Sequence, residues 1–308
     1  MADRQRVLVV GLGTIARTHL SVLAQRSDVT VVAGVDPVVD GLTFPVFRSL
    51  TDALAADPAP DLVVVATPTD THVGLVREIV DRTGALVLSE KPLATTLRDL
   101  AGLADVADRV RVAHHFAFSP EVEWAWRHAA AVDWGRPTRV LSVFHDAYAH
   151  LPASRLASLV SSWVDTAPNQ LSVLAPFIGP CELVSHSDER RRAVTVLAHD
   201  GGRTVLTSNW LAADSSKQTS LSYEGDREVR LDHSSLTVTV LEGGLVTEQV
   251  GYTGTAGRKE AHYRGLYDVL LADPSDPRLG VPFATDIARL LEATASSAPA
   301  GQRWSEIG

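Results

Sequence analysis

The chain has 308 residues, which is long enough for two domains, because a single hydrophobic core rarely grows beyond about 250–300 residues. Hydrophobic residues make up 45% of it and charged residues 21%, an ordinary balance for a globular protein. The net charge of −9, without a basic cluster, excludes a nucleic-acid-binding surface. No apolar run reaches the roughly 18–20 residues that span a bilayer, so we expect no membrane partner.

The N-terminus and the cysteine content both favour a cytoplasmic location. The first apolar run is too short for a signal peptide and leads directly into glycines. Cys181 has no second cysteine with which to form an internal disulfide, which fits a reducing compartment. We therefore expect a cytoplasmic protein.

The first third of the chain alternates strand and helix patterns. Continuous apolar runs predict strands that are covered on both faces, and apolar residues at helical spacing predict the helices between them. This alternation indicates βαβ units and a parallel sheet. The predicted strands are 6–10, 29–35, 62–66, 86–89 and 110–114, and the predicted helices are 14–26, 71–83 and 96–107.

After residue 119 the pattern changes. Short strands separated by Gly and Asp turns predict antiparallel hairpins, with helices before and after them. The predicted strands are 138–147, 183–186, 193–199, 204–211, 219–223, 228–232, 236–241 and 245–251. The predicted helices are 121–131, 152–160, 168–177, 258–271 and 281–296.

A glycine-rich turn, Gly11-Leu12-Gly13-Thr14-Ile15-Ala16, follows the first predicted strand and opens the first predicted helix. Gly11 would permit a tight turn, Gly13 would let a pyrophosphate approach the backbone, and Ala16 keeps helix and strand close. The helix then directs its free N–H groups at the phosphates. The turn predicts dinucleotide binding, and the alternative is a scaffold of the same fold without a phosphate ligand.

The end of the second predicted strand bears on the choice of cofactor. Asp36 lies there, 20 residues beyond Ala16, where a carboxylate can accept hydrogen bonds from the adenosine ribose. The chain continues Pro37-Val38-Val39, so a 2′-phosphate would meet a carboxylate without a compensating cation. We therefore expect NAD, with NADP as the alternative.

These patterns predict an α/β protein of two domains. Residues 1–119 would form a dinucleotide-binding Rossmann domain with a doubly wound parallel sheet. Residues 120–308 would form an α+β domain with a large, mainly antiparallel open-faced sheet, for substrate binding and oligomerisation. Because strand 193–198 alternates without a strongly polar exposed face, we expect a homodimer or homotetramer through that sheet.

Ordered motifs along the chain resemble those of the Gfo/Idh/MocA family of oxidoreductases, which includes glucose–fructose oxidoreductase and inositol dehydrogenase. The resemblance implies that Thr67, Pro68, His72, Glu90 and Lys91 lie at the cofactor. Trp163 is expected either to border the nicotinamide or to lie in the core. The motifs are 11–16 with His19, Ala66-Thr67-Pro68 with His72, Ser89-Glu90-Lys91-Pro92-Leu93-Ala94, Phe118-Ser119-Pro120, Trp134-Gly135-Arg136-Pro137 and Ala298-Pro299-Ala300-Gly301.

Lys91 is the candidate proton-transfer residue. It follows a buried parallel strand, at the edge where ligands of open α/β sheets bind, and Pro92 biases its backbone away from the α region. The chain has three lysines, at 91, 217 and 259, among 28 basic residues, and a desolvated lysine can lose its proton whereas arginine cannot. Beside a nicotinamide, Lys91 could exchange a proton with the substrate oxygen as hydride moves. The alternative is a surface lysine in a solvated loop.

One helix of the second domain departs from the family pattern. The family often carries an Asp there, followed four residues later by a His that acts as acid/base on the substrate hydroxyl. Asp165 matches the first position, but Asn169 stands at the second, and asparagine cannot carry a proton. The usual mechanism is therefore in doubt.

Three explanations of this departure remain open. Lys91 alone handles the proton, or another group near the domain junction replaces the histidine, or the protein binds without catalysis. Candidates for the second explanation are Tyr148, His145 and His115. The histidines of the chain lack zinc-ligand spacing, so we expect no metal.

The resulting functional hypothesis is an NAD(P)-dependent oxidoreductase. It would transfer hydride between nicotinamide and a small carbonyl or hydroxyl substrate, either sugar-like or an intermediate of secondary metabolism. The alternatives are a catalytically silent dinucleotide-binding protein, and an imine reductase or redox-neutral enzyme with a tightly held cofactor.

Overall fold

A computed structural model describes the chain from residue 4 to residue 297, apart from residues 57–58, 95, 153, 155, 157–158, 253 and 255–256. The motif Ala298-Pro299-Ala300-Gly301 and part of the helix predicted at 152–160 lie outside the described residues.

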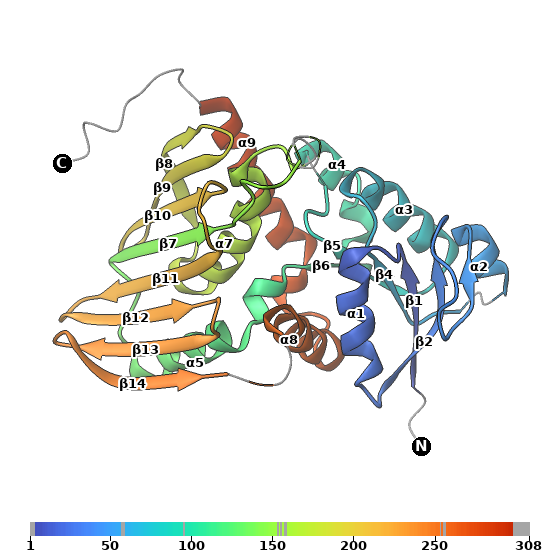
Figure 1. Ribbon diagram of the computed structural model, residues 1–308, viewed down its shortest axis with the longest axis horizontal. Helices are drawn as coiled ribbons and strands as arrows, with labels where there is room; N and C mark the ends of the chain where they lie inside the picture. Colours follow the sequence, from blue (N-terminus) through green and yellow to red (C-terminus); the bar gives the residue numbers. More distant parts are fainter. Residues whose placement is uncertain are drawn as a thin grey trace. The chain divides into compact units, whose positions relative to one another are not determined.

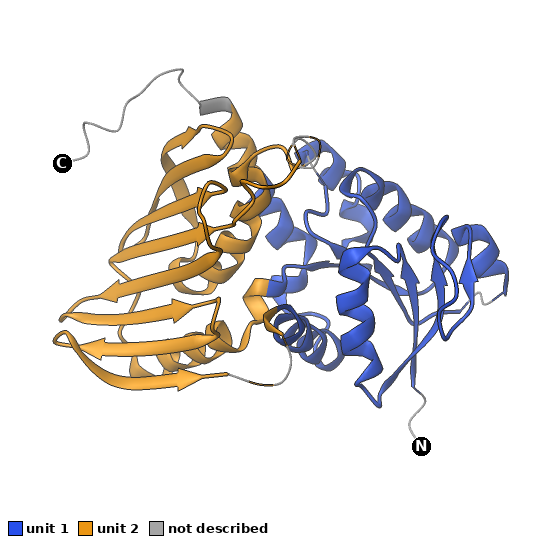
Figure 2. Ribbon diagram, viewed as in Figure 1, with its two compact units in different colours: residues 1–115, 259–288 blue, residues 116–258, 289–308 orange. Residues whose placement is uncertain are grey.

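The chain forms two compact units, coloured separately in Figure 2. Unit 1 comprises residues 1–115 and 259–288, and unit 2 comprises residues 116–258 and 289–308. These units differ from the contiguous segments expected from the sequence, because residues 259–288 pack with the first unit. Their tyrosines find hydrogen-bonding partners there, as described below.

Unit 1 contains a six-stranded parallel sheet with the order β3-β2-β1-β4-β5-β6, shown in Figure 1. This arrangement confirms the predicted doubly wound Rossmann sheet. The chain switches between the two halves of the sheet where β1 lies beside β4, and ligands of such sheets bind at that switch point. The strands are β1 (Gln5–Val10), β2 (Val29–Val35), β3 (Val46–Phe47), β4 (Leu62–Val65), β5 (Leu86–Glu90) and β6 (Val110–Ala113).

Short elements account for the differences from the predicted helices of unit 1. The helix expected at 96–107 divides into α4 and a 3₁₀ turn, with Gly102 as the C-cap of α4. β3 and α2 are too short to produce a clear hydrophobic period. The helices are α1 (Thr14–Ala24), α2 (Leu50–Ala56), α3 (His72–Arg82), α4 (Leu97–Ala101) and α8 (Arg258–Ala272), with 3₁₀ turns η1 (Thr69–Thr71), η2 (Ala104–Arg109) and η4 (Pro277–Leu279).

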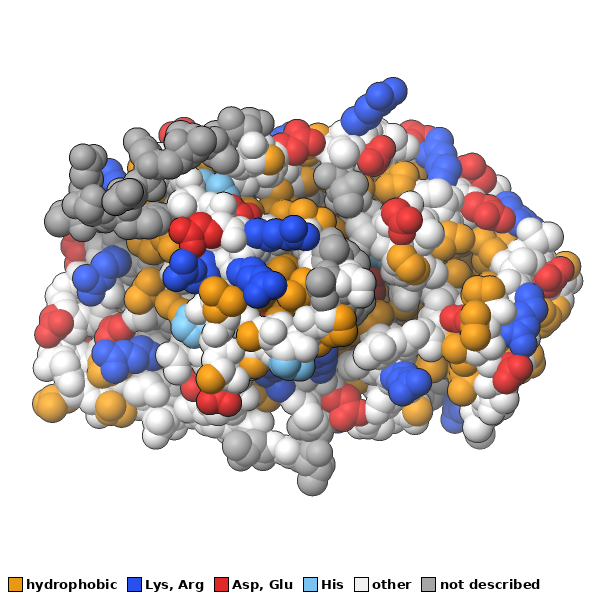
Figure 3. Space-filling view, turned by 45° about the horizontal axis from the view of Figure 1, so that its top comes forward, with side chains coloured by type: hydrophobic (Ala, Val, Ile, Leu, Met, Phe, Trp, Pro, Cys, Tyr) orange, Lys and Arg blue, Asp and Glu red, His pale blue; other side chains and the backbone are white. Residues whose placement is uncertain are grey.

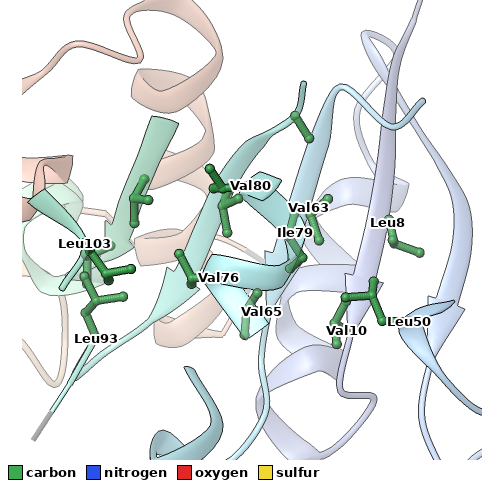
Figure 4. Packing of buried hydrophobic residues seen from close by; sticks show 14 of the residues in the cluster. Leu8, Val10, Leu50, Val63, Val65, Val76, Ile79, Val80, Leu93 and Leu103 are labelled. Carbon is green, nitrogen blue, oxygen red and sulfur yellow. The ribbon is translucent and has the colours of Figure 1, made fainter. Parts of the chain in front are cut away.

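The core of unit 1 lies between its sheet and its helices (Figure 4). Val63 and Val65 on β4 point toward the helix side, where Val76 and Ile79 of α3 pack against the sheet. All four side chains are fully buried. Apolar strands covered in this way hold the carboxyl ends of β1, β4 and β5 in fixed positions, which is where the candidate site lies.

Unit 2 contains an eight-stranded sheet with the order β14-β13-β12-β11-β7-β10-β9-β8. All neighbours pair antiparallel except β7 and β10, which are parallel, so the predicted mainly antiparallel sheet is confirmed. The strands are β7 (Arg139–His145), β8 (Cys181–Asp188), β9 (Arg192–His199), β10 (Gly202–Asn209), β11 (Ser216–Tyr223), β12 (Arg227–Asp232), β13 (Thr237–Glu242) and β14 (Leu245–Gly251). The helices are α5 (Pro120–Val132), α7 (Ser162–Ile178) and α9 (Val281–Ser297), the last divided between the units, and η3 (His115–Phe118) precedes α5.

One face of this sheet is covered by α5 and α7. Along β7, Val140 and Ser142 are fully buried whereas Leu141, which points the other way, is 45% exposed. The sheet is therefore open-faced, as predicted. The homo-oligomer expected through this face remains a prediction.

A buried polar network joins the sheet of unit 2 to both covering helices. His233 Nδ1 lies 2.8 Å from Glu121 Oε1 of α5, and its Nε2 lies 3.0 Å from Thr219 Oγ1 of β11. Thr219 donates to Ser142 Oγ, which also accepts from Gln170 of α7. Because buried polar groups need these partners, the network fixes where α7 sits on the sheet.

α7 begins earlier than the predicted helix at 168–177. Ser161 is its N-cap, and the Ser161 hydroxyl accepts a hydrogen bond from the backbone N–H of Val164. The cap and the buried Trp163 extend the helix toward its N-terminus, so Asp165 lies in the first turn.

Basic and acidic side chains are interspersed on the face of the molecule shown in Figure 3. Of the described helices, none is both long and apolar enough to cross a membrane.

Candidate active site

The glycine turn connects β1 to α1 through a backbone conformation that only glycine adopts easily. Gly11 has φ +85° and donates its N–H to the carbonyl of Val35 at 2.8 Å. A Cβ on Gly11 would lie 2.7 Å from the carbonyl oxygen of Ala66. Gly11 is therefore required by the packing of the protein itself.

Gly13 differs from Gly11, because no described atom crowds it. It is the N-cap residue of α1 with φ −72°, and a Cβ there would meet nothing described within 4 Å. No side chain caps the helix, and its first turn, which includes exposed Thr14 and half-buried Ile15, carries no acidic residue. Ala16 is fully buried. An uncapped helix N-terminus beside open space fits a pyrophosphate group.

Asp36 follows β2 and is bound by the glycine turn. Its Oδ2 accepts from the N–H of Leu12 at 2.9 Å, and its Oδ1 accepts from the N–H groups of Val38 and Val39 at 2.8 Å. Burial alone would raise the pKa of Asp36, but these N–H groups and the nearby charge of Arg48 hold it below its usual value. Asp36 is therefore an ionised acceptor at the edge of the turn.

Arg48 is a cation that sequence reasoning missed at this position. It donates to Asp40 Oδ2 at 2.9 Å and to the carbonyl of Val39 at 3.2 Å. The expectation that no cation accompanies Asp36 is therefore wrong, because β3 returns the chain to the loop after β2. Only the tertiary fold brings Arg48 there.

His72 joins the loops that follow β4 and β5. Its Nε2 lies 2.9 Å from the carbonyl of Thr67, and its Nδ1 lies 2.9 Å from the carbonyl of Pro92. Thr67 Oγ1 lies 2.6 Å from Thr71 Oγ1, and Thr71 donates to the carbonyl of Pro68. His72 is 1% exposed, so a buried side chain links the two loops.

Glu90, the last residue of β5, lies in a buried hydrogen-bond network. It accepts from the Tyr263 hydroxyl at 2.5 Å, and His19 Nε2 lies 2.9 Å from the same oxygen. His19 Nδ1 lies 2.7 Å from the Tyr267 hydroxyl. Burial would raise the pKa of Glu90, but His19, Tyr263 and the charge of Lys91 lower it below its usual value. Burial and Glu90 raise the pKa of both tyrosines, so both hydroxyls stay protonated, and Tyr263 donates to Glu90.

Lys91 follows Glu90 at the carboxyl end of β5, is half-buried, and joins Pro92 through a cis peptide bond. The neighbouring strand β6 ends beside it, and His114 follows that strand. Burial, together with the charge of Lys91, lowers the pKa of His114 to about 3. His114 is therefore a neutral imidazole, and Lys91 provides the positive charge at this edge of the sheet.

The other predicted catalytic residues lie in unit 2. Asp165 and Asn169 are half-buried and one turn apart on α7. Tyr148 lies in the loop after β7, with its ring centroid 5.8 Å from that of Trp210. Trp163 is 2% exposed and donates its indole N–H to Thr294. This contact explains the burial of Trp163, and the contact expected with the nicotinamide stays a prediction.

Sequence reasoning missed Tyr263 and Tyr267, which complete the Glu90 network from α8. Their spacing of four residues could have indicated them, because it places both tyrosines on one face of the predicted helix. In the part of the chain that the structure describes, no group of three or more His, Cys, Asp or Glu side chains is arranged to hold a metal ion.

Comparison with known proteins supports the interpretation of unit 1. Residues 5–118 match the Gfo/Idh/MocA family, described as an oxidoreductase family with an NAD-binding Rossmann fold. These residues belong to the Gfo/Idh/MocA family. The resemblance inferred from the motifs is thereby confirmed for this part of the chain.

Related proteins extend the likeness. The rhizopine catabolism protein MocA of Rhizobium meliloti is 33% identical over 115 residues. This match spans 35% of the present chain and 36% of that relative.

Two solved structures share the fold across both units. GenD2 from gentamicin A biosynthesis, in complex with NAD, is 21% identical with a TM-score of 0.78, covering 98% of this chain and 96% of that one. KijD10, a 3-ketoreductase from Actinomadura kijaniata in complex with NADP and TDP-benzene, is 18% identical with a TM-score of 0.79, covering 96% and 98%.

Gly13→Ala should abolish tight dinucleotide binding while the protein stays folded, because the added methyl group meets no described atom within 4 Å but occupies the space expected for the pyrophosphate. Gly11→Ala should lower the unfolding temperature in addition to weakening dinucleotide binding, since its Cβ would collide with the backbone of Ala66. Thermal unfolding and fluorescence titration with NADH measure both effects. Wild-type NADH affinity in Gly13→Ala would show that the pyrophosphate binds elsewhere.

Tyr263→Phe should destabilise the protein at pH 7 by about 1.5–3 kcal/mol, the usual effect of a lost hydrogen bond to a charged group. Folding lowers the pKa of Glu90 below its ordinary value of 4.5. The ionised carboxylate therefore stabilises the folded protein above pH 4.5, and this stabilisation is lost as the pH falls through the lowered pKa. The difference between wild type and variant should therefore shrink in acid. Denaturant unfolding at several pH values measures it. Tyr252→Phe, in half-buried surroundings, is the control, and an equal loss in both variants would contradict the role of Tyr263.

Proposed function

We propose that the protein is an NAD(P)-dependent oxidoreductase that transfers hydride between the nicotinamide and a carbonyl or hydroxyl carbon of a small substrate. The observation that carries this proposal is a single sheet edge in unit 1. The open, uncapped turn at Gly13 and the half-buried Lys91 lie at the carboxyl ends of strands of the same parallel sheet.

The residues of unit 1 fit a dinucleotide. The turn of residues 11–16 would hold the pyrophosphate, and Asp36 would accept hydrogen bonds from the ribose. The loop of Thr67 and Pro68, supported by His72, would border the nicotinamide half, with Glu90 beneath it. When bound, the nicotinamide supplies or accepts the hydride.

Lys91 would move the proton that accompanies the hydride. In reduction, its ammonium group donates a proton to the carbonyl oxygen as that carbon receives hydride, and in oxidation the neutral amine accepts the hydroxyl proton. Glu90 is a positioning residue, because its carboxylate lies next to Lys91 in the chain and is fixed by His19 and Tyr263. The neutral His114 nearby does not compete for the proton.

Unit 2 would bind the substrate. Asp165, Asn169 and Tyr148 carry groups that accept or donate hydrogen bonds to hydroxyl and carbonyl oxygens. The 3-ketoreductase KijD10 and the gentamicin-pathway protein GenD2 share the fold. This likeness favours a sugar-like ketone or an intermediate of secondary metabolism as the substrate.

Lys91→Ala should lower turnover by about 10²–10⁴-fold, the usual contribution of a positioned acid/base, while NADH affinity changes little. The assay follows NADH or NADPH oxidation with a panel of keto-sugars, cyclic ketones and imines. Lys259→Ala, which removes an exposed lysine, is the control. Equal turnover in wild type and Lys91→Ala would refute the role of Lys91. Cofactor binding without turnover in wild type would favour the silent alternative.

NAD is the proposed cofactor, since ionised Asp36 would repel a 2′-phosphate. Asp36→Asn should improve NADPH affinity relative to NADH by about tenfold, or roughly 1.4 kcal/mol. The substitution removes the negative charge that would repel the 2′-phosphate, and the positive charge of Arg48 can then attract it. Fluorescence titrations with both dinucleotides measure the ratio. Asp40→Asn is the matched control for the loss of one negative charge beside Arg48, and an equal shift there would assign the preference to overall charge.

A further inference from the structure

Unit 2 contains an almost completely buried lysine. Lys217 lies near the start of β11 and is 4% exposed, whereas Lys259 is an exposed residue. Its Nζ lies 2.5 Å from Oδ1 of Asp146, which follows β7, and 5.2 Å from the centroid of the Phe144 ring. The exposed side-chain fractions of the ion pair are 6% for Lys217 and 13% for Asp146.

Such a pair is poorly explained by stability alone. Removing two charges from water costs free energy that their attraction often fails to recover, and apolar residues of similar volume frequently stabilise as well or better. The chain also uses arginine for most of its positive charge, and it places one of its three lysines here. A ligand-binding role explains a buried charge that packing does not require.

The described residues do not accept all the hydrogen bonds that Lys217 can donate. A lysine ammonium group has three N–H donors, and among the described residues Asp146 is the one acceptor within hydrogen-bonding distance of Nζ. Burial lowers the pKa of Lys217 below its usual value, and Asp146 opposes that shift. Two N–H groups of this buried cation therefore have no acceptor among the described residues, which is costly unless a ligand supplies acceptors.

The position of Lys217 within unit 2 indicates which ligand. Lys217 alternates with Gln218 along β11 and shares the helix-covered face with Thr219. The charge of Asp165, in the first turn of α7, acts on Lys217, and Asn169 lies one turn further along that helix. Lys217 therefore belongs to the end of the covered face where the helix expected to bind substrate begins.

The described charges that act on Lys217 are of both signs. Asp146 and Asp165 are acidic, and Arg258 is the second basic group whose charge acts on Lys217. Because the described groups that act on Lys217 bring no excess of positive charge, they favour a neutral ligand over an additional carboxylate or phosphate. Neutral hydroxyl or carbonyl oxygens can accept the remaining N–H groups without adding charge.

We propose that Lys217, positioned by Asp146, donates hydrogen bonds to neutral hydroxyl or carbonyl oxygens of the substrate. This inference rests on the proposed function and gives unit 2 a substrate-binding cation on the helix-covered face of its sheet. Lys217 thereby selects polyhydroxylated, uncharged substrates.

Nuclear magnetic resonance of ¹⁵N-lysine-labelled protein tests binding without requiring turnover, because the chain has only three lysines. The probes are myo-inositol, D-glucose and D-fructose at high millimolar concentration, added to the NADH-saturated protein, with D-glucuronate as the anionic comparator. The Lys217 Nζ signal, assigned by its loss in Lys217→Arg, should shift with a neutral probe while the Lys259 signal stays in place. A shift with glucuronate alone, or with no probe, overturns the proposal.

Kinetics give an independent test with the substrate on which wild type is most active. Lys217→Met should raise KM by about 10–100-fold, as expected for lost hydrogen bonds from a charged donor, with a smaller change in kcat and unchanged NADH affinity. Lys217→Arg should restore part of the affinity, and Lys259→Met should behave as wild type. A wild-type KM in Lys217→Met overturns the proposal. If Lys217→Met does not fold, the resonance experiment on wild type decides.

The two proposals fail in different ways. A Lys217 signal that responds to neutral polyols, in a protein that transfers no hydride, supports the binding role and refutes the oxidoreductase. Hydride transfer with equal KM in wild type and Lys217→Met supports the oxidoreductase and refutes the binding role.

Discussion

The buried carboxylate of Glu90 connects the parts of unit 1 on which the proposed chemistry depends. Its hydrogen bonds to His19 and Tyr263 join α1, which begins at the dinucleotide turn, to the end of β5 and to α8. A buried carboxylate without such partners would be protonated or would destabilise the fold. The same bonds therefore stabilise the unit and fix the residue next to Lys91.

This network also explains why residues 259–288 belong to unit 1. The Tyr263 and Tyr267 hydroxyls are buried and need hydrogen-bonding partners, and Glu90 and His19 provide them. α8 is consequently part of the support of the candidate site, although it follows the whole sheet of unit 2 in the chain. Ionised Glu90 and neutral His114 leave Lys91 as the positive group at the ends of β5 and β6.

Unit 2 uses buried polar groups in two ways. The network from Glu121 through His233 and Thr219 satisfies groups on the sheet and both covering helices, which gives α7 a defined position. The Lys217–Asp146 pair is different, because the ammonium group retains donors that the described residues do not accept. We interpret the first as structural and the second as a binding site, because in the second the N–H groups without a described acceptor belong to a buried cation.

The sequence by itself determined most elements, the parallel and antiparallel character of the sheets, and the dinucleotide turn with Lys91. These features depend on local periodicity and on residues that are contiguous in the chain, such as Gly11 beside Gly13 and Glu90 beside Lys91. The tertiary structure alone decided the partners of Asp36, Glu90 and Lys217. Arg48, Tyr263 and Asp146 reach them through sheet pairing and helix packing between distant segments, and no local pattern encodes which buried charges will meet.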